Sequence, residues 1–484
     1  MTDALKANDD KLYRILFYIV FVGSILIYFW GIWSIPTLSH NEARRMIVVQ
    51  EMLANHDWLI PTLNDKIYLE KPPFFYWLAL FFSLVFQSTA EWVMRLPSAL
   101  SAFGLTWLVY NRVKKYIGRW EALFAALMLV TSVQFTMFAR RAEIEMVLTA
   151  CCAASLIYYF DYLKTQSGSK YLYVSYLFLG LAFLTKGPVA LVFFVPPILT
   201  FGLVKKDRRA LRGLLSLGGW AIFSIIAFPW FVYTYLHMEK RMEKVIHKDV
   251  TYKIFNLENR DPFYEYILVL LGAFIPWILI VFYKTKKMIS SFFSGSDKAY
   301  FAYGFLVPLV IMSLFATKHA KYVLPLIPCL AILLGIWFAN LAAEFAARSR
   351  EKFHFRSIFV VSIMVFGFFL YYAAVEAQVY KYRYEAFEPL IAKVNASAKG
   401  HPVFLYKDLY YRVVYYYGKP IPVLEEPEVQ DRIKQGESFL LIADSRNWND
   451  LKDEELCTVA EFRPFIKKDR AVRVLASHSL CPPS

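Results

Sequence analysis

The sequence predicts an α-helical protein that crosses a membrane many times and carries a small α/β domain outside it. Of its 484 residues, 58% are hydrophobic and 18% are aromatic, while only 19% are charged. The apolar runs at 12–33 and 359–375 have about the length that crosses a hydrocarbon core. Hydrophobicity falls after residue 376, where short β-like runs surround a helical stretch. We therefore expect a membrane domain over 1–375 and an external α/β domain over 376–484.

The basic residues predict which loops face the cytoplasm. The net charge of +15 would also suit nucleic-acid binding, but its distribution favours membrane topology. Four short connections are rich in Lys and Arg and contain few acids, which is typical of cytoplasmic loops. They lie at 112–119, 205–212, 284–298 and 348–356. By contrast, 236–261 carries six basic and five acidic residues, so we expect that loop outside and expect no nucleic-acid partner.

The basic loops also decide whether the apolar run at 73–86 crosses the membrane. If 12–33 crosses outward and 73–86 also crosses, the loop at 112–119 and every later basic loop fall outside. The run is short, and Tyr76 and Trp77 suit the headgroup region, so we predict that it lies on the membrane. About eleven spans remain, and the C-terminus is external. The expected spans are 12–33, 95–111, 120–139, 145–163, 171–186, 188–204, 213–236, 263–283, 299–316, 322–342 and 357–375.

The longest external segment is expected at 35–94, with two interfacial helices. The first helix is predicted over 41–58, where apolar residues recur at helical spacing, and the second is the run at 73–86. In the C-terminal domain, strands are expected at 402–406, 439–443 and 472–476, with a helix near 426–435.

The cysteines say little about function. Cys457 and Cys481 both fall in the external domain, where an oxidising compartment permits a disulfide, and the sequence leaves this pairing open. The remaining cysteines lie in expected spans and are interpreted as core residues.

Ionisable residues gather on the expected external face, where they are candidates for function. Structural explanations compete: Arg140 and Arg141 suit the anchoring of a helix end, and Glu42 suits the dipole at a helix start. Lys186 lies between apolar segments and therefore needs an anion or water. Carboxylates and several cations at one membrane face suggest acid–base chemistry on a phosphate-bearing lipid. The candidates are His40, Asn41, Glu42, Arg44, Tyr68, Glu70, Lys71, Arg140, Arg141, Glu143, Glu145, Lys186, Lys318 and Lys321.

Six motifs in order along the chain resemble one family. They are the stretch 41–78, MRLPSAL (94–100), EMVLTA (145–150), LAFLTKGPVALV (181–192), PWFV (229–232) and ATKHAKYVLPLIP (316–328). Together they resemble the bacterial aminoarabinose transferases of the GT-C superfamily, with the protein O-mannosyltransferases as more distant kin. The resemblance implies a GT-C-like fold and transfer of a hexosyl or pentosyl group from a polyprenyl-phosphate donor. The implied acceptor is a lipid A or other envelope glycoconjugate, outside the bacterial cytoplasmic (inner) membrane.

The resemblance also implies roles for residues. Family members begin the first external helix with Asp-Glu, whereas this chain has Asn41-Glu42, so Glu42 is the matching acid and His40 an extra candidate base. Glu145 occupies the second acidic position, and both acids are expected to be catalytic. Cations that match the family's phosphate-binding set are Lys71, Lys186 and Lys318, and His247 falls where relatives carry a histidine. With them we place Arg44, Tyr68, Glu70, Arg141 and Tyr322 as candidate substrate-binding residues.

The residues agree with this chemistry in outline. A departing lipid phosphate needs cations, and an acceptor needs a base. The sequence has no glycine-rich nucleotide loop and no Asp-x-Asp motif, which favours a lipid donor without a required metal. Glu70 with His247 is a possible divalent-cation pair. Protein O-glycosylation, transport and a catalytically silent scaffold remain as alternatives, the last because of Asn41.

Overall fold

A computed structural model describes most of the chain and divides it into two compact units. Unit 1 comprises 1–32, 69–86 and 92–372, and unit 2 comprises 33–68, 87–91 and 373–484. The described residues are 3–37, 39–165, 169–246, 261–275, 277, 285–346, 350–376, 387–444, 447, 456–462, 471–477 and 480–481. The fold is mostly helical with one small C-terminal sheet, so the predicted fold class is confirmed.

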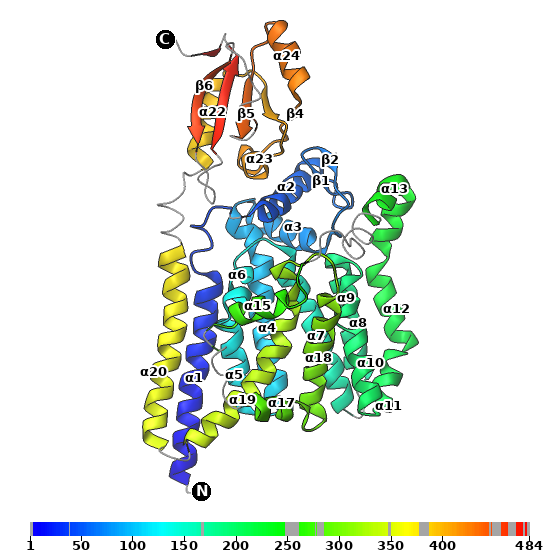
Figure 1. The fold of residues 1–484 in the computed structure, drawn as a ribbon, viewed down its shortest axis with the longest axis vertical. Helices are drawn as coiled ribbons and strands as arrows, with labels where there is room; N and C mark the ends of the chain where they lie inside the picture. Colours follow the sequence, from blue (N-terminus) through cyan, green and yellow to red (C-terminus); the bar gives the residue numbers. More distant parts are fainter. Residues whose placement is uncertain are drawn as a thin grey trace. The chain divides into compact units, whose positions relative to one another are not determined.

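Unit 1 is built from helices (Figure 1). Those in its first half are α1 (Asp3–Phe29), α3 (Phe74–Phe86), α4 (Glu91–Tyr116), α5 (Arg119–Val130), α6 (Val133–Ala139), α7 (Ile144–Lys164), α8 (Ser169–Lys186), α9 (Val189–Val192) and α10 (Val195–Val204). Those in its second half are α11 (Arg208–Leu214), α12 (Leu217–Ala227), α13 (Pro229–Ile246), α15 (Glu265–Ala273), α17 (Thr285–Phe293), α18 (Ser296–Ser313), the 3₁₀-helix η2 (Ala320–Leu326), α19 (Ile327–Ala346) and α20 (Arg350–Leu370).

Five helical stretches among the described residues are long and apolar enough to cross a membrane. A sixth is added if α5 and α6, which meet at a 66° bend, count as one span. The five are Asp9–Phe29, Ile144–Lys164, Arg208–Ala227, Ala320–Glu344 and Arg356–Ala374. Each predicted span contains helix, although the described part of 263–283 includes only α15 and its flanks. The number eleven therefore stays a prediction.

Contacts bring the basic loops together at one end of unit 1, where α1 begins and where α11 and α17 lie (Figure 1). Arg119 pairs with Asp10 near the start of α1, and Lys164 pairs with Asp297. Lys205 donates to the carbonyl of Phe293 at 3.3 Å. A common location is what the positive-inside pattern requires of cytoplasmic loops.

The EKPP motif ends just before α3. Pro72 and Pro73 cannot lie inside a helix without disrupting it, and α3 starts at Phe74. The helix has 13 residues, or about 20 Å at 1.5 Å per residue, which is shorter than a hydrocarbon core of about 30 Å. Its length supports the prediction that this run lies along the membrane.

Two arginines fasten the end of α1 within unit 1. Arg140 donates from Nη1 to the carbonyl oxygens of Ile27 and Trp30, at 2.6 and 2.7 Å. Arg95 donates to Ile32 at 2.6 Å. The last carbonyls of a helix lack partners within it, so Arg140 acts as a cap, while Arg95 holds the turn that follows α1. These contacts favour the structural interpretation of Arg140.

Unit 2 joins residues 33–68 and 87–91 to the C-terminal domain. Its helices are α2 (His40–Asn55), α22 (Phe387–Ala398), α23 (Tyr411–Tyr417) and α24 (Glu426–Lys434), with the one-turn π-helix η3 (Tyr371–Glu376) at the boundary. Its strands are β1 (Thr62–Leu63), β2 (Lys66–Ile67), β3 (Val403–Tyr406), β4 (Val423–Leu424), β5 (Leu440–Asp444), β6 (Leu456–Phe462) and β7 (Val472–Ser477). The larger sheet has the order β4-β3-β5-β7-β6, with β3 parallel to β4 and β5.

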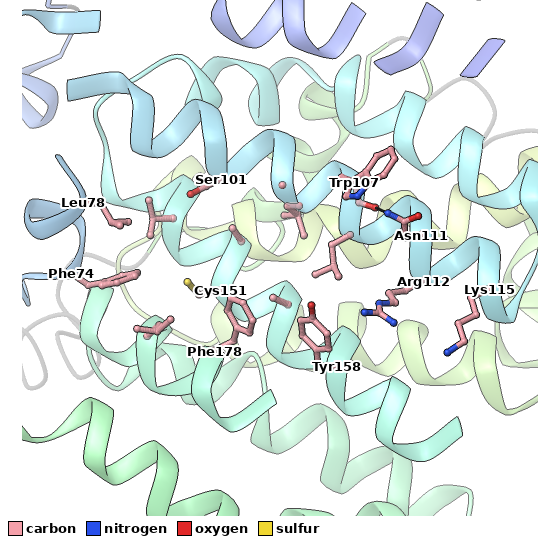
Figure 2. Close-up of a pocket in the computed structure, with 17 residues that line it drawn as sticks. Phe74, Leu78, Ser101, Trp107, Asn111, Arg112, Lys115, Cys151, Tyr158 and Phe178 are labelled. Carbon is pink, nitrogen blue, oxygen red and sulfur yellow. Dashed lines mark hydrogen bonds between the residues drawn. The ribbon is translucent and has the colours of Figure 1, made fainter. Parts of the chain in front are cut away.

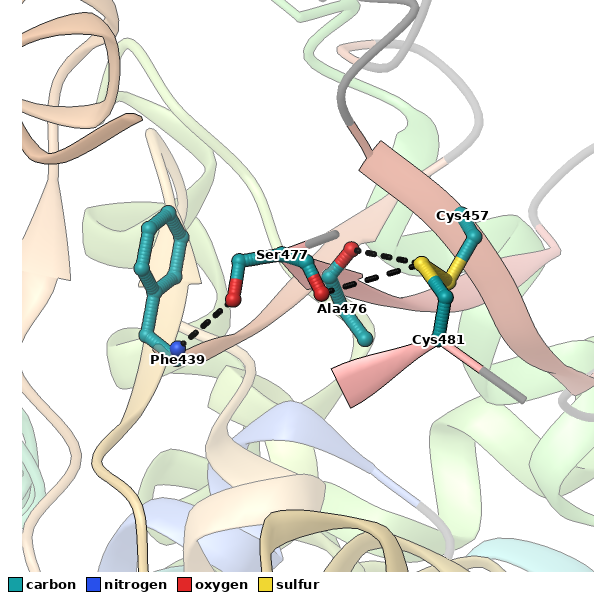
Figure 3. Close-up of a disulfide and its surroundings, with 5 residues drawn as sticks. All are labelled: Phe439, Cys457, Ala476, Ser477 and Cys481. Atoms are coloured by element: carbon teal, nitrogen blue, oxygen red, sulfur yellow. Dashed lines mark hydrogen bonds between the residues drawn. A yellow bond between two sulfur atoms is a disulfide. The ribbon is translucent and has the colours of Figure 1, made fainter. Parts of the chain in front are cut away.

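Specific hydrogen bonds hold unit 2 together. The Asn64 side chain donates to the carbonyl of Ile421 at 2.9 Å and accepts from its N–H at 2.8 Å. Glu51 of α2 accepts from the Asn64 N–H at 2.6 Å, which fixes the turn between β1 and β2. Cys457 and Cys481 form a disulfide, the pairing that the sequence left open (Figure 3).

Candidate active site

Local sequence places Glu145 and Lys186 at the same end of unit 1. α6 ends at Ala139, and α7 begins at Ile144, so Glu145 lies in the first turn of α7. α8 ends at Lys186 because Gly187 adopts a left-handed conformation (φ 76°) and Pro188 follows. α7 packs along α8 and also against η2, which carries Lys321 and Tyr322.

The resulting group, called here the acid–lysine cluster, consists of Glu143, Glu145, Lys186 and Lys321. The Glu145 carboxylate lies between two ammonium groups, with Lys186 Nζ and Lys321 Nζ each 3.3 Å from Oε1. Lys321 also lies 3.8 Å from Glu143 Oε2. Both glutamates are buried, whereas the two lysines retain some exposure. The lysines are therefore the members that a ligand can reach.

Tyr322 and Lys71 complete the surroundings of Lys186. The Lys186 ammonium lies 4.5 Å from the centroid of the Tyr322 ring, within the range of a cation–π contact. Lys71 and Lys321 are near enough for their charges to act on Lys186. Three lysines from distant parts of the sequence thus share one region.

Arg141 adds a fourth cation beside the cluster. It lies in the turn between α6 and α7, and its Nε is buried without a hydrogen-bond partner among the described residues. Within the same part of the chain it forms no ion pair. Together with Glu70, which precedes Lys71, the region contains four cations and three carboxylates and therefore has a positive excess. Such an excess favours binding of an anion.

Lys318 is engaged differently. Its ammonium donates to the carbonyl oxygens of Asp261 and Phe315, at 2.9 and 2.8 Å, and its backbone N–H donates to Asp261 Oδ2 at 2.6 Å. Its exposed fraction is 5%. These contacts favour a structural part for Lys318, and its phosphate-binding role stays a prediction.

Unit 2 holds the other predicted site residues. Glu42 lies in the first turn of α2, is fully buried, and its backbone N–H is capped by Ser39 Oγ at 3.0 Å. Arg44 stacks over the ring of Tyr411 at 4.8 Å. The Tyr68 hydroxyl accepts from Arg45 Nη1 at 2.9 Å. The position of Glu42 also suits the helix dipole, so the structural interpretation of this acid remains open.

His247 lies outside the described residues. Among the residues that the structure describes, no group of three or more His, Cys, Asp or Glu is arranged to hold a metal. The possible cation pair of Glu70 with His247 accordingly stays a prediction.

Two residues of this region have no role that the sequence alone predicts. Lys321 was a candidate, but the family motif drew attention to Lys318 instead. Asp261, which fixes the loop of Lys318, was not singled out at all. Lys318 precedes η2 whereas Lys321 lies within it, so the two side chains leave the backbone from different local structures.

Fold and cluster together define a class: a helical membrane protein with a buried acid–lysine cluster at the end of unit 1 opposite its basic loops. A family model described as dolichyl-phosphate-mannose-protein mannosyltransferase matches residues 70–233. An uncharacterized protein of Aquifex aeolicus is 29% identical, over 73% of this chain and 79% of its own length.

Named relatives extend the comparison. The undecaprenyl phosphate-alpha-4-amino-4-deoxy-L-arabinose arabinosyl transferase of Serratia proteamaculans is 25% identical over 68% of this chain, which spans 58% of that relative's length. The crystal structure of ArnT from Cupriavidus metallidurans bound to undecaprenyl phosphate superposes with a TM-score of 0.82, covering 97% of this chain and 99% of that one at 18% identity. The chain has the ArnT fold, and the predicted resemblance is confirmed.

Proposed function

We propose that this protein is a membrane glycosyltransferase that moves a sugar from a polyprenyl-phosphate donor to a lipid A-type or other envelope acceptor. The reaction takes place on the external face of the cytoplasmic membrane, and no metal is required. The observation that carries the proposal is the acid–lysine cluster, which joins buried carboxylates to reachable lysines at the end of unit 1 away from the basic loops. The relatives named for an undecaprenyl-phosphate sugar donor support the donor class.

The cations act on the leaving group. When the bond between sugar and phosphate breaks, negative charge develops on the phosphate oxygens. This charge is stabilised by hydrogen-bond donors from Lys71, Lys186 and Arg141. Because the region is partly dehydrated, such contacts are strong. The Tyr322 ring holds the Lys186 ammonium from one side.

The carboxylates have separate tasks. The Glu145 carboxylate already has Lys186 Nζ and Lys321 Nζ each 3.3 Å from Oε1. Glu145 therefore positions Lys186 and Lys321 rather than accepting the acceptor's proton. Glu42 matches the acid that the family carries at the start of this helix, and it is the base in this proposal. The neighbouring Asn41 cannot take a proton.

The sugar is the finer part of the proposal. Relatives are named for 4-amino-4-deoxy-L-arabinose, a pentose, which supports a pentosyl group. The decisive experiment offers purified protein radiolabelled polyprenyl-phosphate donors of pentose and hexose type with lipid A and peptide acceptors. Label should move from a pentosyl donor to lipid A, and Glu42→Gln should abolish transfer while Asn41→Asp is tolerated.

The same assay separates the alternatives. Transfer to peptide alone would favour the protein O-glycosyltransferase, which the mannosyltransferase family model supports. No transfer by the wild type, with transfer gained in Asn41→Asp, would favour a silent scaffold. Substrate flux without transfer would favour a transporter.

A further inference from the structure

A groove in unit 1 has none of the acid–lysine cluster in its lining. α3, α4, α7 and α8 enclose a volume of about 780 Å³ (Figure 2). Along α4 its lining runs from Ser101 to Lys115, which at 1.5 Å per residue is about 21 Å. A hydrocarbon core is about 30 Å thick, so the groove follows most of the membrane depth.

The two ends of the groove differ in chemistry. Figure 2 shows Phe74 and Leu78 at one end and Arg112 and Lys115 at the other, with Tyr158 beside Arg112. The end with Arg112 and Lys115 is also the end of unit 1 at which the basic loops gather. A molecule that fits must therefore be apolar over most of its length and anionic at this end.

The groove opens toward the lipid-facing surface. A Cβ placed on Gly104 would meet nothing within 4 Å, and Gly104 is exposed. Trp107, one helical turn further along α4, is 44% exposed. A lipid chain can thus enter sideways from the bilayer.

The basic end has unused capacity for an anion. Arg112 pairs with Asp161 at 3.2 Å and lies over the Tyr158 ring, but its Nε is buried without a hydrogen-bond partner among the described residues. Lys115 contacts the ring of Tyr116, and within the described part of the chain no carboxylate forms an ion pair with it. Arg112 and Lys115 thus share the carboxylate of Asp161, so this end of the groove keeps a net positive charge.

We propose that the groove binds an anionic phospholipid from the leaflet on the side of the basic loops. Its phosphate lies at Arg112 and Lys115, and one acyl chain follows α4 toward Phe74. A free phosphate would leave the apolar length uncovered, and a zwitterionic lipid would bring its own ammonium beside two cations. This site goes beyond the proposed reaction, because the donor phosphate belongs at the opposite end of unit 1.

The test measures lipid binding to the purified full-length protein in detergent by native mass spectrometry, with no sugar donor present. Phosphatidylglycerol should bind at least roughly tenfold more tightly than phosphatidylcholine, because a charge-assisted contact is worth about that factor or more. Lys115→Glu should lower phosphatidylglycerol affinity roughly tenfold. Lys114→Glu is the matched control: it changes the same charge on the same helix turn, but Lys114 does not line the groove.

A second pair of variants tests the apolar part. Gly104→Leu should fill the groove and displace the lipid while favouring the helix. Gly367→Leu, at another exposed and open helical glycine outside the lining, should leave binding unchanged. Equal retention of both phospholipids, equal effects of Lys114→Glu and Lys115→Glu, or retention by Gly104→Leu would overturn the proposal. Displacement of phosphatidylglycerol by undecaprenyl phosphate, with the same sensitivity to Lys115→Glu, would also overturn it and assign the groove to a polyprenyl chain.

Discussion

The two ends of unit 1 use the same side chains in different surroundings. At one end Glu145 is 3% exposed and lies between Lys186 and Lys321. At the other end Lys287 and Glu344 form a pair of similar length, 3.1 Å, with side chains that are 65% and 46% exposed. Water screens the exposed pair, whereas the buried acid has lost its hydration and depends on its partners. Ion pairs of similar length therefore contribute differently to the stability of the protein.

The largest expected effect comes from removing the buried acid. Glu145→Ala leaves two lysines without their shared partner and should lower the free energy of unfolding by about 3 kcal/mol. Glu344→Ala, at the exposed end, should cost about 1 kcal/mol or less. Thermal unfolding in the same detergent measures both. Equal losses in the two variants would show that burial does not distinguish the ends.

The next effect concerns donor use. Lys186→Ala removes a charge-assisted contact of about 1.5–3 kcal/mol, so kcat/KM for the donor should fall roughly 10- to 100-fold. Lys287→Ala should leave it unchanged, because that lysine belongs to the other end. Lys186→Arg should rescue poorly, since a planar guanidinium replaces a compact ammonium in a confined place. Wild-type turnover of Lys186→Ala at limiting donor would remove Lys186 from the phosphate site.

A smaller effect separates structural from phosphate-binding lysines. Lys318→Met keeps the apolar stem but removes the donors to two carbonyl oxygens, and should cost about 1–3 kcal/mol of stability. The KM for the donor should hold near its wild-type value, as measured at a temperature where the variant is folded. A raised donor KM with unchanged stability would restore the predicted phosphate-binding role.

Much of the fold could be predicted because membrane helices follow simple rules. Apolar length, basic loops and the two prolines of EKPP placed α3 and α7 to within one residue at each end, whereas α1 and α20 begin nine and seven residues before the expected starts. The C-terminal strands at 402–406, 439–443 and 472–476 were also expected. The sequence missed α22, α23 and β6, because their apolar residues pack against partners far along the chain and their local patterns are weak.

The site was harder to predict for a related reason. The resemblance supplied Glu145 and Lys186, but the roles of neighbouring lysines depend on which oxygen each side chain reaches. Lys318 lies just before η2 and Lys321 lies within it, and one donates to backbone carbonyls while the other pairs with Glu145. Spacing alone does not carry that information.

The last prediction assigns a membrane side to the basic end of unit 1 and to the C-terminal domain, with the smallest disturbance. Cysteine replaces Lys287, an exposed residue of the basic end, or Lys434, an exposed residue of α24 in the C-terminal domain. The native cysteines give little background, since Cys457 and Cys481 are bridged and the other three are buried. An impermeant thiol reagent should label Lys434→Cys in intact cells and Lys287→Cys only after lysis, with stability and activity unchanged in both. Labelling in the opposite order would place the basic loops outside. The acid–lysine cluster, at the other end of unit 1, would then lie on the cytoplasmic side, which is the wrong face for transfer to an envelope acceptor.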